Sequence, residues 1–185
     1  MKVLLTSCGL ETIGIRTKYL ELLDRDMSTV KALFIPTAAI DADAISVLPM
    51  CMNDLLNCNI LKENITVYDL HKPMSASEIE QYDTVYICGG NTEYLLNRIN
   101  EVKFQQSLLP YINNDGVVVG VSAGSVIFAN NLKNNLGLVK QDLDVHCNEA
   151  ECEKLGCLNS ERNERIKLGN LQALVIESDN RYIIG

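Results

Sequence analysis

The chain has 185 residues, of which 47% are hydrophobic and 22% are charged, and this balance excludes intrinsic disorder and collagen-like repeats. A single domain over residues 1–185 is expected, because a chain of this length buries roughly 70% of the surface that its unfolded form exposes. The net charge of −8 argues against nucleic acid or an anionic membrane as a partner, since phosphates would repel such a surface. No apolar stretch is long enough for a transmembrane helix. Residues 3–5 form too short an apolar run for a secretory signal, so a cytoplasmic protein is expected.

Apolar residues alternate along the chain between the two-residue period of strands and the longer period of helices. In chain order the expected elements are a strand at 2–6, a helix at 15–23, a strand at 31–35, a helix at 44–56, strands at 65–70 and 83–88, helices at 92–99 and 104–112, a strand at 117–120, a helix beginning near 123, a strand at 143–146, a polar helix at 159–167, and strands at 171–176 and 181–184. Strands that alternate with helices predict a mostly parallel sheet covered on both faces, which is a doubly wound α/β sandwich.

The ligand crevice of such a sheet lies beyond the carboxyl ends of its strands. At one of these ends the chain reads Gly120-Val121-Ser122-Ala123-Gly124, which matches the G-x-S-x-G pattern of a nucleophile elbow. A side chain at either glycine would collide with the neighbouring strand or helix. The pattern favours Ser122 as a nucleophile, and the alternative is a turn of small residues that serves only helix-sheet packing.

Gly89-Gly90-Asn91-Thr92 follows another expected strand and opens a helix. Glycine lets a backbone N–H face the crevice, and a helix N-terminus adds a positive dipole, so an oxyanion would be stabilised there. The second N–H donor would be that of Ala123. Taken alone, two glycines at a strand end are a weak signal, because a simple turn has the same sequence.

A serine nucleophile needs a base, and the chain has two histidines, His71 and His146. His71 precedes Pro73 in an expected surface loop. His146 ends a strand-like run after the serine and has carboxylates nearby in sequence, as expected for a base that a carboxylate orients. We therefore expect His146 to be the base.

These motifs together resemble the S51 serine peptidases, the family of dipeptidase E and cyanophycinase. The resemblance rests on residues 88–92, on residues 120–125 and on the lone His146 within 144–148, and residues 31–38 are similar to the second strand of that family. It extends from residue 1 to about 150.

The resemblance implies a fold like that of class I glutamine amidotransferases, with serine in place of their cysteine. It implies Ser122 as nucleophile, His146 as base, Gly90 and Ala123 as oxyanion donors, and Asn91 beside the substrate. The reaction it implies is hydrolysis after an N-terminal aspartyl residue or at a β-aspartyl linkage, with a small acidic peptide as substrate. It implies no metal and no organic cofactor.

The third member of the triad is not settled by the sequence. The segment 126–145 between serine and histidine is shorter than the family leads us to expect, and its run of asparagines and lysine at 130–135 offers no matching aspartate. We favour Glu177, because it ends the expected strand 171–176 and a carboxylate beyond a strand end faces the crevice. The alternatives are Asp142, Asp144 and Asp179.

Seven cysteines without a C-x-x-C pair indicate reduced thiols in a cytosolic protein. His146, Cys147, Cys152 and Cys157 are clustered in sequence and are of the types that bind zinc, but their spacing is unlike that of a zinc knuckle. We therefore expect no metal site.

A dipeptidase also needs a cation for the substrate carboxylate, and Arg162, Arg165 and Arg181 are the candidates. A catalytically degraded homologue that binds a ligand or partner, and an acyltransferase or amidase with the same triad, are the competing functions. Assembly as a homodimer stays open.

Overall fold

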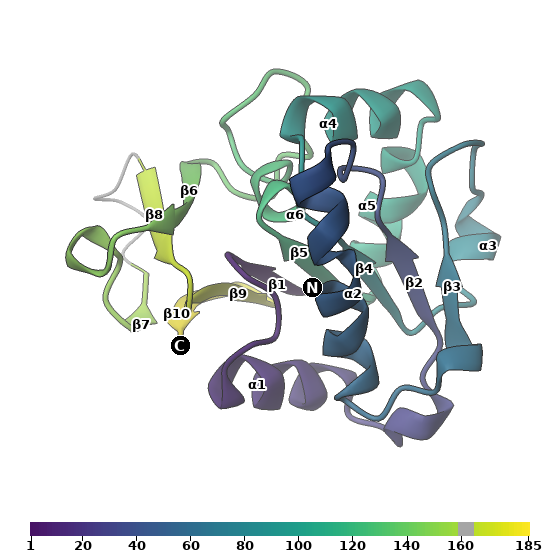
Figure 1. The fold of residues 1–185 in the computed structure, drawn as a ribbon, viewed down its shortest axis with the longest axis horizontal. Coiled ribbons are helices and arrows are strands. Elements are labelled where there is room, and N and C mark those ends of the chain that lie inside the picture. Colours follow the sequence, from purple (N-terminus) through teal and green to yellow (C-terminus); the bar gives the residue numbers. More distant parts are fainter. Residues whose placement is uncertain (159–164) are drawn as a thin grey trace.

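The computed structural model describes residues 1–158 and 165–185. Its centre is an eight-stranded sheet in the order β3-β2-β4-β5-β1-β9-β10-β7, flanked by helices (Figure 1). The strands of this sheet are β1 (Lys2–Thr6), β2 (Ala32–Ile35), β3 (Ile65–Val67), β4 (Thr84–Ile87), β5 (Val117–Val121), β7 (Gly156–Cys157), β9 (Ala173–Glu177) and β10 (Asn180–Ile184). The helices are α1 (Ile13–Leu23), α2 (Ala42–Leu56), α3 (Ala76–Ile79), α4 (Thr92–Glu101), α5 (Gln105–Asn113) and α6 (Ala123–Val126), with 3₁₀ turns η1 (Met27–Thr29), η2 (Lys62–Asn64) and η3 (Glu149–Glu151).

The first five strands in the sheet order are parallel to one another, as expected from their alternation with helices. β9 pairs antiparallel with β1, β10 antiparallel with β9, and β7 antiparallel with β10. The expected doubly wound, mostly parallel α/β fold is therefore confirmed. Because β9 is antiparallel to β1, the carboxyl end of β9 lies at the end of the sheet where β1 begins, away from the carboxyl end of β1.

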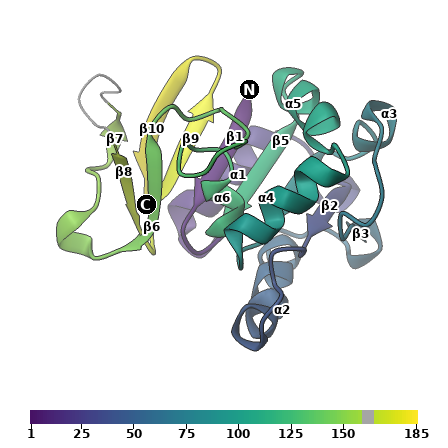
Figure 2. The same cartoon turned by 90° about the horizontal axis from the view of Figure 1, so that it is seen from above.

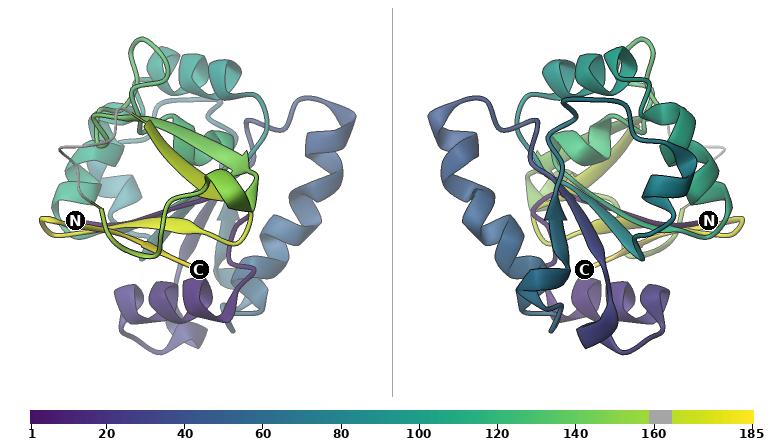
Figure 3. Two further views of the ribbon diagram at one scale, coloured as in Figure 1. Left: turned by 90° about the vertical axis from the view of Figure 1, so that its left-hand side faces the viewer. Right: turned by 90° about the vertical axis from the view of Figure 1, so that its right-hand side faces the viewer.

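Two apolar layers hold the helices against the two faces of the sheet. Val3 and Leu5 belong to the layer that packs under α3, α4, α5 and α6, whereas Leu4 between them belongs to the layer under α1 and α2. This alternation follows from the two-residue period of a strand. Figure 3 shows α1 on the opposite side of the sheet from the teal helices.

The last third of the chain adds a small second sheet beside β1. In it β6 (Asp142–Cys147) runs parallel to β8 (Arg165–Gly169), and the pairing shifts register between Asp144 and Cys147. Figure 2 shows this sheet next to the β9–β10 hairpin, on the side of the molecule away from β3. The expected polar helix at 159–167 is wrong where it can be tested, because residues 165–167 lie in β8; residues 159–164 are outside the described part of the chain.

No helix in residues 1–158 or 165–185 combines the length and apolar character needed to cross a membrane.

Candidate active site

Ser122 lies in a strained turn between β5 and α6. Its backbone has φ 49° and ψ −111°, a conformation that residues with a Cβ rarely adopt and that costs about 1–3 kcal/mol. Its N–H donates to the carbonyl oxygen of Thr6 at 2.9 Å. The hydroxyl of Ser125 lies 2.8 Å from that same oxygen and 2.8 Å from the carbonyl oxygen of Gly120. These bonds fix the turn at the carboxyl edge of a central strand.

The two glycines of the motif allow this turn to pack tightly. A Cβ on Gly120 would lie 2.4 Å from the carbonyl oxygen of Gly124, and a Cβ on Gly124 would lie 2.2 Å from that of Ile87. Both distances are far below van der Waals contact. The steric role expected for these glycines from the sequence is therefore confirmed.

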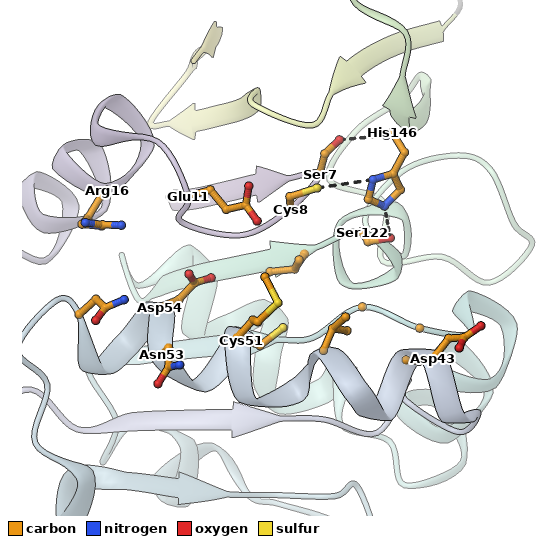
Figure 4. Close-up of a pocket in the computed structure, with 17 residues that line it drawn as sticks. Ser7, Cys8, Glu11, Arg16, Asp43, Cys51, Asn53, Asp54, Ser122 and His146 are labelled. Atoms are coloured by element: carbon orange, nitrogen blue, oxygen red, sulfur yellow. Dashed lines mark hydrogen bonds between the residues drawn. The ribbon is translucent and has the colours of Figure 1, made fainter.

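His146 faces Ser122, with its Nε2 2.9 Å from the serine Oγ. The histidine belongs to β6 and has a positive φ of 59°, at the place where the pairing of β6 with β8 shifts register. Its backbone N–H donates to the hydroxyl of Ser7 at 3.1 Å. The expected meeting of these two side chains is present, and it joins the elbow to the second sheet (Figure 4).

The other ring nitrogen of His146 contacts two groups that the sequence did not single out. Asn170 Oδ1 lies 2.9 Å from Nδ1, and Cys8 Sγ lies 3.6 Å from the same atom. Asn170 comes from the turn between β8 and β9, and Cys8 comes from the segment directly after β1. The position in which we expected a carboxylate is therefore taken by a neutral amide and a thiol.

The structure does not bring Glu177 to His146, and the expectation that Glu177 orients the base is corrected. β9 is antiparallel to β1, so Glu177 pairs with Lys2 at the edge of the sheet opposite Ser122. There its carboxylate lies 2.8 Å from Lys18 Nζ and accepts a hydrogen bond of 2.8 Å from the Tyr182 hydroxyl.

The alternative carboxylates form ion pairs with another residue or lie at the other end of the sheet. Asp142 and Asp144 both form ion pairs with Arg165, at 2.9 and 2.6 Å. Asp179 lies in the turn between β9 and β10, which is at the same end of the sheet as Glu177.

The glycine pair after β4 approaches the serine closely. A Cβ on Gly89 would lie 3.1 Å from the Cβ of Ser122, and Gly90 has a positive φ of 135° and leaves no room for a Cβ, which would lie 2.1 Å from the carbonyl oxygen of Ala38. Ala123 opens α6, and the first N–H groups of a helix have no partner within it. Of the two predicted oxyanion donors, Ala123 directly follows Ser122 in the chain, and Gly90 lines the same cavity as Ser122.

Asn91 caps α4 through its side chain, which accepts a hydrogen bond of 2.9 Å from the N–H of Tyr94. It lines a separate hollow of about 360 Å³ together with Asn131 and Leu132. In the described part of the chain it is not among the residues that line the cavity containing Ser122. The position of Asn91 beside the substrate stays a prediction.

A cavity of about 770 Å³ opens in front of Ser122 and His146. Its walls come from the segment after β1, from α2 and from the two turns described above (Figure 4). The charged side chains that line it are Glu11, Arg16, Asp43 and Asp54. Arg16 is the cation that the sequence analysis did not consider.

Asp54 and Cys8, which both line the cavity, have raised pKa values. Burial is the largest cause that raises the pKa of the Asp54 carboxyl, against the opposing effects of hydrogen bonds from Tyr86 and from the N–H of Leu10. Burial, followed by the charge of Glu11, raises the pKa of the Cys8 thiol. Cys8 is therefore a neutral thiol near pH 7.

The described residues contain no group of three or more His, Cys, Asp or Glu side chains placed to hold a metal ion. Cys152, one of the residues that clustered with His146 in sequence, points its thiol at the carbonyl oxygen of Asn148, 3.0 Å away.

Comparisons with known proteins support the fold and identify the family of the chain. The chain is similar in structure to a protein from Listeria monocytogenes EGD-e described as a candidate peptidase E, with a TM-score of 0.77 and 19% identity over 99% of this chain and 97% of the other. It is also similar to a peptidase from an acI-B1 actinobacterium, with a TM-score of 0.70 and 16% identity over 100% of this chain and 87% of the other. No curated protein sequence matches the chain. The sequence profile of peptidase family S51 matches residues 3–159, a span that contains Ser122 and His146, and the chain belongs to this family.

Proposed function

We propose that the protein is a serine peptidase in which Ser122 is the nucleophile and His146 is the general base. The observation that carries this proposal is the 2.9 Å contact between Ser122 Oγ and His146 Nε2 at a strained turn that opens on a cavity. A nucleophile and a base within hydrogen-bond reach of each other are the signature of covalent catalysis. Membership of peptidase family S51 supports the same reaction class.

The proposed reaction follows from this geometry. Nε2 of His146 takes the hydroxyl proton while Oγ of Ser122 attacks the scissile carbonyl, and the N–H groups of Gly90 and Ala123 stabilise the oxyanion that forms. His146 then gives the proton to the leaving amine as the C–N bond breaks. Water, activated by the same imidazole, hydrolyses the acyl-enzyme and frees Ser122.

The proposed substrate is a short peptide with an N-terminal aspartyl or β-aspartyl residue, as the family resemblance implies. A cation is needed for the aspartyl carboxylate. Arg16 lines the cavity and donates to the carbonyl oxygen of Leu10 at 3.3 Å. In the described part of the chain neither Arg165, which is paired with two aspartates, nor Arg181 lines this cavity. Arg162 lies outside the described residues. Arg16 is therefore our candidate for the substrate carboxylate.

A fluorophosphonate probe, which reacts covalently with activated serines, tests the proposal directly. We expect one label per chain, located at Ser122 by mass spectrometry, and no label on Ser122→Ala. Hydrolysis of Asp-X, β-Asp-X and Ala-X dipeptides by the wild-type protein then tests the substrate class. Labelling of Ser122 with no preference for Asp-X would retain the serine hydrolase and overturn the aspartyl specificity.

A catalytically degraded homologue that binds a ligand is the second candidate. One observation favours it, which is that a neutral amide and not a carboxylate contacts Nδ1 of the base. Complete absence of labelling at Ser122, in a protein that still binds an acidic dipeptide, would support this candidate over the peptidase.

A further inference from the structure

We propose that one face of α2 is an apolar subsite for the side chain of X in an Asp-X substrate, so that the protein prefers dipeptides in which X is leucine or methionine. The inference rests on the proposed peptidase function. Its direct observation is that Ala44, Val47 and Met50 of α2 line the cavity that also contains the nucleophile and the base.

The residues of α2 that line the cavity follow the period of a helix. Figure 4 shows Cys51 and Asp54 on the face of α2 that is turned toward Cys8, across the cavity. A spacing of three, four and three positions places residues on one face of a helix, and the residues with this spacing are Ala44, Val47, Cys51 and Asp54. This face of α2 is therefore a wall that is apolar at its first three positions and ends in a carboxylate.

The apolar side chains of this wall contribute little to the core. The buried residues of α2 are Cys51 and Leu55, both in its second half, whereas Val47 is 43% exposed and Met50 is 59% exposed. Figure 2 shows α2 projecting from the body of the molecule. Water is removed from such side chains when an apolar group of a ligand packs against them, and this removal favours binding.

The charged side chains of the cavity leave this apolar wall free. Glu11 lies in the segment after β1, Arg16 belongs to α1, and Asp43 lies in the first turn of α2. One carboxylate oxygen of Asp54 already accepts two hydrogen bonds from the protein. A dipeptide with its aspartyl carboxylate on Arg16 can place X against α2, where a polar X would lose water without gaining a partner.

A series of Asp-X dipeptides tests this preference. We expect kcat/KM for Asp-Leu to exceed that for Asp-Ala by at least about tenfold, because each buried CH₂ group contributes about fourfold. Asp-Asn, in which X has nearly the size of leucine but is polar, should be no better than Asp-Ala. A value of kcat/KM for Asp-Lys at or above that for Asp-Leu would overturn the inference and assign the selection of X to the carboxylates of the cavity.

Val47→Ser and Met50→Ser test the wall itself, at exposed positions where the fold does not depend on the side chain. Each should lower kcat/KM for Asp-Leu by about three- to tenfold and leave that for Asp-Gly within about twofold of the wild-type value. Ile45→Ser is the matched control, since Ile45 is 52% exposed on the same helix and, in the described part of the chain, does not line the cavity. Equal losses for the two dipeptides, or the same loss in Ile45→Ser, would overturn the inference.

Binding to Ser122→Ala separates the inference from the proposed function. Titration calorimetry should give a lower Kd and a more negative heat-capacity change for Asp-Leu than for Asp-Asn, and Val47→Ser added to this variant should remove the difference. If fluorophosphonate does not label Ser122 but this preference is present, the proposed function fails and the apolar subsite stands. If Ser122 is labelled but Asp-Leu and Asp-Asn are hydrolysed equally, the proposed function stands and the inference fails. A dimer in sedimentation that Met50→Ser dissociates would show that a second copy covers this face, which would also overturn the inference.

Discussion

The hydroxyl of Ser7 holds the backbone of His146. It accepts the N–H of His146 at 3.1 Å and donates to the carbonyl oxygen of Leu168 at 3.1 Å. Ser7 directly follows β1 and is completely buried, so this one hydroxyl joins the carboxyl end of a central strand to both strands of the second sheet. It also satisfies the N–H of a residue whose φ is 59°.

Ser7→Ala should therefore hold His146 less firmly in its position. The variant leaves a partly buried N–H and a carbonyl oxygen without their partner, which costs about 1–3 kcal/mol of the free energy of unfolding. We also expect kcat to fall while KM stays nearly constant, because the ring is held less well against Ser122. Urea denaturation and steady-state kinetics measure the two effects. Ser77→Ala, on the surface of α3, should change neither value.

Ser122→Ala should abolish turnover and leave substrate binding nearly intact. The hydroxyl supplies the covalent step more than ground-state contacts, so kcat should fall by more than about 10³-fold while the dissociation constant of an acidic dipeptide changes little. Cys88 is not a substitute nucleophile, since it is completely buried and burial is the main cause that raises its thiol pKa well above 9.0. A Ser122→Ala protein with most of its activity, sensitive to iodoacetamide, would contradict this assignment.

The sequence predicted the parts of the site that are local. Gly120, Ser122 and Gly124 lie in one continuous strand-turn-helix segment, where an apolar strand and small residues define the turn without help from elsewhere. His146 was predicted because it was one of only two histidines.

The parts that depend on distant pairing were not predicted. An apolar run such as that of β9 has the same pattern whether it is parallel or antiparallel, so nothing in residues 171–177 placed Glu177 at the far edge. Asn170 was missed because its contact with His146 depends on the pairing of β6 with β8, two segments more than 15 residues apart. The polar residues at the start of β8 also favoured the prediction of a polar helix over that of a strand.

Arg16 should set the affinity for acidic substrates. It lines the cavity that contains Ser122, and we expect Arg16→Met to raise KM for an Asp-X dipeptide with little change in kcat, because it removes a binding contact present in both ground and transition states. KM for Ala-X should not change. Arg165→Met is the control, since Arg165 is paired with Asp142 and Asp144. Equal effects of the two substitutions on Asp-X would remove Arg16 from the substrate site.

Glu177→Gln should affect stability and not catalysis. Hydrogen bonds from Lys18 and then Tyr182 hold the pKa of Glu177 below its usual value of 4.5, and a depressed carboxyl pKa stabilises the fold above the unfolded pKa. The side chain is 39% exposed, so solvent screening limits the loss at pH 7 to less than about 1 kcal/mol. As pH falls through the lowered pKa, Glu177 is protonated. The difference in the free energy of unfolding between wild type and Glu177→Gln should then vanish.

Urea denaturation at pH 7 and at pH 3, with kcat measured at pH 7, checks this prediction. Glu21→Gln is the matched control, because Glu21 contacts the same Lys18 at the longer distance of 3.5 Å and is 59% exposed, and it should have the smaller effect on unfolding. We expect kcat of Glu177→Gln to equal that of the wild-type protein, since its carboxylate lies at the edge of the sheet opposite Ser122. A loss of kcat by orders of magnitude, at unchanged stability, would return Glu177 to the role of orienting His146 and contradict the placement of β9.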